Sequence, residues 1–179
     1  LGARLPDDML VVLPRGQRSI SGDRIGWFRE GLSAAGPQVV EDEAEEARSR
    51  LVDFIEHVQQ RFDVPPARTL LAGFSQGGEL AASAALTAPE RVAGFAMLCG
   101  RILPEIADEV ASRDALVGLH ALVVHGRGDE TLPLEWAERA SAWLGRLRVE
   151  HSVRVHDAGH ELTPAMEDDL VDWAGAPER

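Results

Sequence analysis

The sequence of 179 residues contains no lysine, no asparagine and no tyrosine, and its only cysteine is Cys99. Without lysine there can be no Schiff base and no P-loop lysine, and without tyrosine no tyrosine general acid. The lack of asparagine excludes N-glycosylation sequons. A single cysteine excludes intramolecular disulfides, CxxC redox pairs and multi-cysteine zinc sites. The chemistry left to the chain is that of hydroxyls, imidazoles, carboxylates and one thiol.

The charge balance is strongly acidic, with 18 basic residues, all arginine, against 30 acidic ones and a net charge of −12. This balance disfavours nucleic acid and anionic membranes as partners, because phosphate contacts need an excess of basic side chains. No apolar run approaches the ~18 residues that a membrane span needs. Residues 1–10 lack the basic and apolar regions of a signal peptide. We therefore expect a cytoplasmic protein with no integral membrane segment and no nucleic-acid partner.

Short apolar runs alternate along the whole chain with segments of helical periodicity. Most runs are nearly continuous in valine, leucine, alanine and phenylalanine, which is typical of strands buried on both faces of a parallel sheet. The pattern predicts a single α/β domain over residues 1–179, with helices on both faces of a mostly parallel sheet. The predicted strands are Met9–Leu13, Thr69–Phe74, Val92–Gly100, Ala121–Gly126 and Val153–Asp157.

Three amphipathic helices are predicted between and after these strands. Each shows apolar residues at i, i+3 and i+4 spacing. Thr163 is expected to cap the third helix, with Pro164 at its first position. The acidic run 41–46 is expected to be a solvated start of the first helix, where the helix dipole favours it. The apolar faces are Ala47, Leu51, Phe54, Ile55, Val58 and Phe62; then Trp136, Ala137, Ala140, Trp143, Leu144 and Leu147; and finally Leu162, Met166, Leu170 and Trp173.

The second apolar run leads into the pattern G-x-S-x-G, formed by Gly73-Phe74-Ser75-Gln76-Gly77 and followed by an alanine-rich helical segment. Such a strand-to-helix turn exposes a strained serine above the sheet, and side chains at Gly73 or Gly77 are expected to collide with neighbouring backbone. The turn also aims the backbone N–H of Gln76 at the position of an oxyanion. The alternative is a glycine-rich turn that merely packs closely.

A base and a carboxylate follow two later strands. Asp129 comes after the strand that ends near Gly126, and His160 after the strand that ends near Asp157. The carboxyl ends of strands are where α/β sheets gather their sites, and the order serine, aspartate, histidine is one that hydrolases of this topology use. We therefore predict Ser75 as nucleophile, His160 as general base and acid, and Asp129 as the residue that fixes the imidazole tautomer.

Other polar residues near these loops have simpler interpretations. Glu130 is expected to point away from the site, and Asp157 to make a local loop hydrogen bond, although it is an alternative triad acid. His156 is expected to be structural, and His125 to brace the Asp129 loop. His57 is expected at the surface and Cys99 in the core. A metal site of His156, His160 and Asp129 is an alternative without supporting ligand motif, so we predict no metal and no cofactor.

These motifs resemble the phospholipase/carboxylesterase family of α/β-hydrolases. The resemblance rests on residues 73–78, on His125-Gly126 with Asp129 and Pro133, and on Ala158-Gly159-His160. Two further segments agree with it, Trp27-Phe28 and Gly100–Pro104, whose counterparts in the family border the acyl pocket. The resemblance implies an α/β-hydrolase fold and substrate contacts by Trp27, Phe28, Leu103 and Leu132. Trp27 and Phe28 are equally compatible with a core role.

One feature departs from the family, whose members begin with further strands and a His-Gly loop that donates the second oxyanion-hole N–H. Here Leu1–Asp8 is predicted to be the end of the first helix, and no Leu-His-Gly precedes it. We therefore expect that this sequence lacks an N-terminal segment of the natural protein, with these strands. The alternative is a truncated fold in which the Gln76 N–H is the sole identifiable oxyanion donor. An exposed strand edge left in this way would favour a homodimer.

Three functional hypotheses follow from these residues. The first is a serine hydrolase that cleaves carboxylic esters or thioesters of small or single-chain acyl substrates through an acyl-enzyme intermediate. The second is a non-catalytic α/β-hydrolase scaffold that binds an acyl ligand or a partner protein. The third is lactone cleavage like that of dienelactone hydrolases, which usually carry cysteine where this chain has Ser75.

Overall fold

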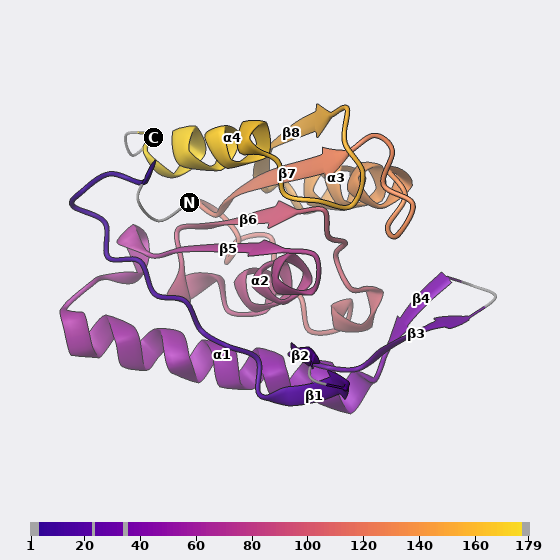
Figure 1. Cartoon of the computed structure of the whole chain (residues 1–179). Helices are drawn as coiled ribbons and strands as arrows, with labels where there is room; N and C mark the ends of the chain where they lie inside the picture. Colours follow the sequence, from indigo (N-terminus) through magenta and orange to yellow (C-terminus); the bar gives the residue numbers. More distant parts are fainter. Residues whose placement is uncertain (1–3, 23, 34–35, 177–179) are drawn as a thin grey trace.

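A four-stranded parallel sheet forms the centre of the computed structural model, which describes residues 4–22, 24–33 and 36–176 (Figure 1). Its strands lie side by side in chain order, and in the first pair Leu70 lies opposite Gly94 and Phe74 opposite Leu98. Four of the five predicted strands and the parallel α/β architecture are thereby confirmed. The strands are β5 (Leu70–Phe74), β6 (Gly94–Leu98), β7 (His120–Gly126) and β8 (Glu150–His156).

Helices cover both faces of this sheet, as predicted. Alternate side chains of each strand point to opposite faces. Phe95 and Met97 of β6 belong to the core cluster formed with α1 (Glu41–Phe62), α2 (Gln76–Thr87) and α3 (Glu135–Leu147). Ala96 and Leu98 belong to a second cluster, formed with α4 (Pro164–Ala174). No helix in the described part of the chain is long and apolar enough to cross a membrane.

Burial differs between the inner and outer strands of the sheet. β6 is buried along its whole length, and β7 is buried from Ala121 onward. β5 and β8 are only partly buried, and Ala72 of β5 is exposed. The expectation of strands buried on both faces therefore holds for the two central strands and not for the two that form the edges of this sheet.

The N-terminal region differs most from its prediction. Met9–Leu13 forms no strand, because its backbone pairs with no other strand of the described chain, and Leu13 is 87% exposed. The predicted helix end over Leu1–Asp8 is also wrong where it is described, since residues 5–8 form a bend and a turn closed by Met9 N–H donating to Pro6 O. Helical geometry is disfavoured for the residue before a proline. Residues 1–3 lie outside the described residues.

Two short antiparallel hairpins, which the sequence did not predict, connect this region to α1. β1 (Arg18–Ser21) pairs with β2 (Arg24–Gly26), and β3 (Glu30–Ser33) pairs with β4 (Gly36–Val39). Figure 1 shows both hairpins near the start of α1. Short 3-10 turns occupy Pro66–Arg68, Pro89–Arg91 and Pro104–Ile106.

The three predicted amphipathic helices are confirmed as α1, α3 and α4, with corrections to their buried faces. Phe54 is 37% exposed and Phe62 is 49% exposed, because the buried stripe of α1 follows Ala44, Leu51 and Ile55. Arg61 covers the ring of Phe62 instead. Leu162 precedes its helix and is exposed. The side chain of Thr163 accepts a hydrogen bond from Met166 N–H and caps α4, as predicted.

Candidate active site

Ser75 lies on the turn between β5 and α2 with φ of 52° and ψ of −123°. This positive φ is a strained conformation for a residue with a Cβ, and it is held by a hydrogen bond of 2.8 Å from Ser75 N–H to Leu98 O on β6. A Cβ at Gly73 would lie 2.1 Å from the carbonyl carbon of Gly77. The predicted collision at Gly77 is wrong, because a Cβ there would meet nothing within 4 Å.

This asymmetry predicts opposite results for two alanine substitutions. Gly73→Ala is expected to cost more than ~4 kcal/mol of unfolding free energy, because the clash is with backbone that cannot rotate away. Gly77→Ala is expected to stay within ~1 kcal/mol of wild type, because the position is open and alanine favours the helix. Urea unfolding of both variants measures the difference. Equal destabilisation by both would contradict the close packing of Gly73.

Hydrogen bonds fix the side chain of Asp129 in the loop after β7. Its side chain is buried, and Oδ1 accepts hydrogen bonds from Thr131 N–H at 2.9 Å and Leu132 N–H at 2.8 Å. His125 Nε2 donates to Leu132 O at 2.7 Å and lies 3.6 Å from Asp129 Oδ2. His125 therefore braces the Asp129 loop, as predicted.

The loop after β8 brings His160 to Asp129. Backbone hydrogen bonds join the two loops, from Arg127 N–H to His156 O at 2.8 Å and from Gly128 N–H to Ala158 O at 2.9 Å. The approach at Gly126 is so close that a Cβ there would lie 2.3 Å from Gly159 O. Glycine is the residue that permits this contact between backbones.

Ser75, His160 and Asp129, predicted from three separate motifs, lie in one hydrogen-bonded chain. His160 Nδ1 is 2.8 Å from Asp129 Oδ2, and His160 Nε2 is 3.0 Å from Ser75 Oγ. The imidazole is 20% exposed, and its ring packs against Phe74 with centroids 5.1 Å apart. A base in contact with the hydroxyl and a buried carboxylate behind the base are the arrangement that activates a serine nucleophile.

The alternative residues have other partners. Asp157 pairs with Arg127 at 3.1 Å, and His156 Nε2 lies 2.7 Å from Asp169 Oδ2. Glu130 and His57 are exposed, as expected. Cys99 is buried in the second core cluster, and burial raises the pKa of its thiol. The described residues contain no group of three His, Cys, Asp or Glu side chains arranged to hold a metal ion.

Gln76 is the first residue of α2, so its backbone N–H has no acceptor four residues earlier within the helix. This donor stands beside Ser75, at the positive end of the helix dipole, where negative charge is stabilised. The sequence did not predict a role for the Gln76 side chain. Its Oε1 accepts from Trp27 N–H at 2.6 Å, and its Nε2 donates to Phe28 O at 2.8 Å.

The four residues predicted to contact substrate differ in their exposure. Phe28 and Leu103 are 0% and 2% exposed and belong to the first core cluster. Leu132 is 5% exposed; its backbone N–H donates a hydrogen bond to Asp129, and its carbonyl oxygen accepts one from His125. Trp27 is half-buried and packs against the first core cluster. Of these four side chains, Trp27 has the largest surface left for a ligand.

A buried contact between an arginine and a glutamate, which the sequence did not predict, lies next to the nucleophile turn. Arg101 Nε contacts Glu79 Oε1 at 3.2 Å, and both side chains are 1% exposed. Burial, together with the charge and hydrogen bond of Glu30, raises the pKa of Glu79 well above its ordinary value of 4.5, against the opposing effect of Arg101. The charged face of Arg101 also lies 5.1 Å from the ring centroid of Trp136.

The raised pKa of Glu79 predicts a pH-dependent stability. Between its ordinary value of 4.5 and its folded pKa, the folded protein holds a proton that the unfolded chain lacks. The contribution of Glu79 to the free energy of unfolding is therefore largest below that pH range. It falls as the pH rises through the range, by at most about 1.4 kcal/mol per pH unit. Glu79→Gln is expected to remove this slope while keeping an oxygen for Arg101.

Urea unfolding of wild type and Glu79→Gln from pH 4 to pH 9 measures the effect as the difference between the two curves. The same substitution at Glu138, which is exposed in α3, is the matched control and is expected to leave the slope unchanged. Parallel curves for wild type and Glu79→Gln would contradict the prediction.

The chain is similar in sequence to known proteins. The family model described as phospholipase/carboxylesterase matches residues 14–173. An acyl-protein thioesterase 1 from Eremothecium gossypii is 30% identical over 111 residues, which are 60% of this chain and 47% of that protein. The corresponding match in Gibberella zeae is 29% identical over 118 residues, 63% of this chain and 50% of that protein. The chain thus spans about half the length of the curated relatives it matches.

Solved structures establish the fold. A carboxylesterase from Bacillus cereus superposes with a TM-score of 0.76 at 18% identity, covering 89% of this chain and 72% of the other. A carboxylesterase from Mesorhizobium loti gives a TM-score of 0.74 at 21% identity, covering 91% and 74%. The predicted α/β-hydrolase fold is thereby confirmed.

Proposed function

Because the chain belongs to the phospholipase/carboxylesterase family, we propose that it is a serine hydrolase that cleaves carboxylic esters or thioesters of small or single-chain acyl groups. The observation that carries this proposal is the contact of 3.0 Å between His160 Nε2 and Ser75 Oγ, backed by the contact of 2.8 Å between His160 Nδ1 and Asp129. Its similarity to an acyl-protein thioesterase and to a carboxylesterase supports the same reaction class.

In the proposed reaction, Ser75 Oγ attacks the acyl carbonyl carbon while its proton passes to His160 Nε2. The carbonyl oxygen becomes an oxyanion, which the backbone N–H of Gln76 and the positive end of α2 would stabilise. Collapse of this intermediate breaks the bond to the alcohol or thiol, which leaves with the proton from His160. The acyl group remains on Ser75.

Deacylation repeats these steps with water as the nucleophile. His160 takes a proton from water, the hydroxide attacks the acyl-serine carbonyl carbon, and the bond to Ser75 Oγ breaks as His160 returns the proton. Asp129 keeps the Nδ1 proton of His160 in place throughout and stabilises the imidazolium. Every step uses side chains of this chain and water, so the proposal requires no metal and no cofactor.

The test combines turnover with covalent labelling. Purified protein is assayed with p-nitrophenyl esters of two to twelve acyl carbons and with the corresponding thioesters, and is treated with a fluorophosphonate probe. We expect hydrolysis and a single adduct, which peptide mass spectrometry assigns to Ser75. Protein with a native circular dichroism spectrum that neither hydrolyses these substrates nor forms the adduct would overturn the proposal and favour a non-catalytic binding role.

A further inference from the structure

The connector between the two hairpins is held by side chains from distant parts of the chain. β2 ends at Gly26 and β3 begins at Glu30, so residues 27–29 lack the hydrogen bonds of a strand ladder. Buried backbone polar groups need partners. Side chains bind Trp27 N–H, Phe28 O and Arg29 N–H, and Arg29 O accepts from the backbone N–H of Val40. The Oε1 atom of Gln76 accepts a hydrogen bond from Trp27 N–H at 2.6 Å, and its Nε2 atom donates one to Phe28 O at 2.8 Å.

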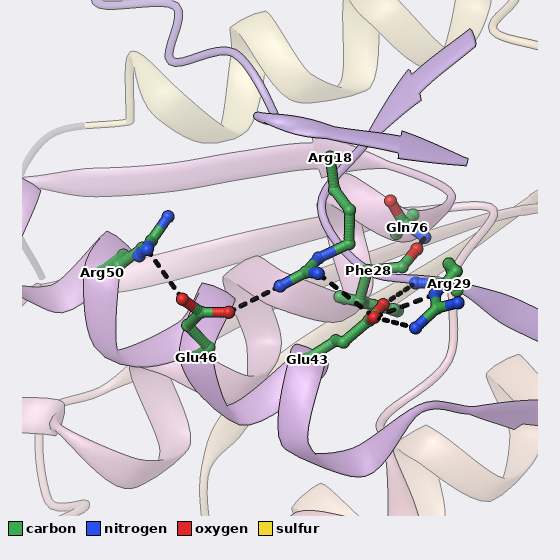
Figure 2. A network of polar contacts seen from close by, with 7 residues as sticks. All are labelled: Arg18, Phe28, Arg29, Glu43, Glu46, Arg50 and Gln76. Carbon is green, nitrogen blue, oxygen red and sulfur yellow. Dashed lines mark hydrogen bonds and ion pairs between the residues drawn. The ribbon is translucent and has the colours of Figure 1, made fainter. Parts of the chain in front are cut away.

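Glu43 in the first turn of α1 holds the other end of this connector. Its carboxylate accepts from Arg29 N–H at 2.9 Å, from Arg29 Nε at 2.8 Å and from Arg18 Nη1 at 3.2 Å, as Figure 2 shows. These hydrogen bonds with Arg29 lower the pKa of Glu43 and keep it ionised. Glu43 is buried, so the expectation that the whole acidic run is solvated is wrong for this residue.

The Gln76 contacts bring the connector beside the nucleophile. Gln76 directly follows Ser75, and in Figure 2 its amide group points to the backbone at Phe28. Phe28 is 0% exposed and anchors the connector in the core, whereas the neighbouring Trp27 is half-buried. The Gln76 side chain therefore holds the Trp27 backbone next to the nucleophile turn, together with the Phe28 anchor and the Glu43 contacts of Arg29.

We propose that the Gln76 side chain, separately from the Gln76 backbone N–H, fixes the segment Gly26–Arg29 beside Ser75 and thereby sets discrimination between short and long acyl chains. Gln76 is a positioning residue in this role, and the role rests on the proposed esterase activity. An acetyl group reaches little beyond the reacting carbonyl, whereas each further methylene gains energy only by packing on a fixed apolar wall. In this proposal the half-buried side chain of Trp27 supplies such a wall.

Gln76→Ala separates the two roles, because it removes both side-chain hydrogen bonds and keeps the backbone donor. We expect the octanoyl-to-acetyl ratio of kcat/KM to fall about tenfold, mainly through a higher KM for the octanoyl ester. Gln59→Ala is the matched control. Gln59 in α1 also makes two side-chain hydrogen bonds, to Thr69 Oγ1 at 2.8 Å and Arg91 O at 2.7 Å, away from the site. The Gln59→Ala substitution is expected to leave the octanoyl-to-acetyl ratio of kcat/KM unchanged.

Gln76→Glu adds a pH readout. The introduced carboxylate can still accept from Trp27 N–H, but when ionised it faces the Phe28 carbonyl oxygen with no proton to donate. The octanoyl-to-acetyl ratio is expected to be low at pH 8 and to recover as pH falls and the carboxyl is protonated. In wild type, where residue 76 carries an amide that does not titrate, the ratio is expected to stay flat with pH.

Amide hydrogen exchange tests the contact without any activity. The peptide containing residues 26–29 is expected to exchange at least about tenfold faster in Gln76→Ala than in wild type, and to be unchanged in Gln59→Ala. Unchanged exchange in Gln76→Ala would overturn the positioning role. Faster exchange with an unchanged octanoyl-to-acetyl ratio, in an enzyme that hydrolyses both esters, would overturn the role in chain-length discrimination. Wild-type protein that hydrolyses neither ester overturns the proposed function and, with it, that discrimination, whereas the exchange result still decides the contact.

Discussion

Replacing Ser75 with alanine is expected to lower ester turnover by about six orders of magnitude and to abolish fluorophosphonate labelling. Ser75 Oγ lies 3.0 Å from His160 Nε2, in a position to give it its proton. Alanine removes that nucleophile and leaves the oxyanion donor, so what remains is the weak attack of water on a bound ester. The measurement is kcat/KM for a p-nitrophenyl ester on freshly purified protein.

Ser83→Ala is the matched control for this variant. Ser83 lies in α2, the helix that follows Ser75; it is buried and donates through Oγ to Glu79 O at 2.8 Å. Ser83→Ala also removes a serine Oγ, and it is expected to keep turnover within about threefold of wild type. Retention of more than one per cent of turnover in Ser75→Ala, with Ser83→Ala unaffected, would show that another group attacks the substrate.

The sequence could predict that Ser75, Asp129 and His160 lie close together because each follows the end of a strand within four residues. Parallel strands end at one edge of a sheet, so the residues that follow β5, β7 and β8 had to come together once the strands were identified. His125 was interpreted correctly for a related reason, since its partner Leu132 is only seven residues away. Interactions within a strand and its following loop are local, and local patterns reveal them.

The missed interactions join segments that are far apart in the sequence. Gln76 bonds to Trp27, 49 residues earlier, and Arg101 meets Glu79, 22 residues earlier. Nothing in the composition of either segment identifies such a partner. The acidic run was misjudged at Glu43 because the helix dipole explained its charge equally well without Arg29.

The errors in secondary structure have a similar origin. Met9–Leu13 has the composition of a strand but no neighbour to pair with among the described residues, and a strand without a ladder leaves its backbone to solvent. A steric clash was expected at both Gly73 and Gly77, but only a Cβ at Gly73 would clash. The sequence motif identifies the two glycines but not the atoms that surround each of them. Pairing and contact are properties of the assembled chain rather than of a segment.

Asp129→Asn is expected to lower turnover about 10⁴-fold at neutral pH while leaving the fold intact, and the surrounding hydrogen bonds show why. Oδ1 of Asp129 accepts from two backbone N–H groups, those of Thr131 at 2.9 Å and Leu132 at 2.8 Å. An asparagine has one acceptor oxygen, and these two donors hold it in that position. Its NH₂ group must then occupy the place of Oδ2, which faces His160 Nδ1 at 2.8 Å.

An NH₂ group in that place can only donate, so His160 would present a bare Nδ1 and carry its proton on Nε2. A protonated Nε2 cannot take the proton of Ser75 Oγ, 3.0 Å away. Asp157→Asn is the matched control, because Asp157 lies three residues from His160 but pairs with Arg127, and its side chain is 92% exposed. We expect kcat/KM of that variant within about twofold of wild type. A larger loss in Asp157→Asn than in Asp129→Asn would transfer the role of triad acid to Asp157.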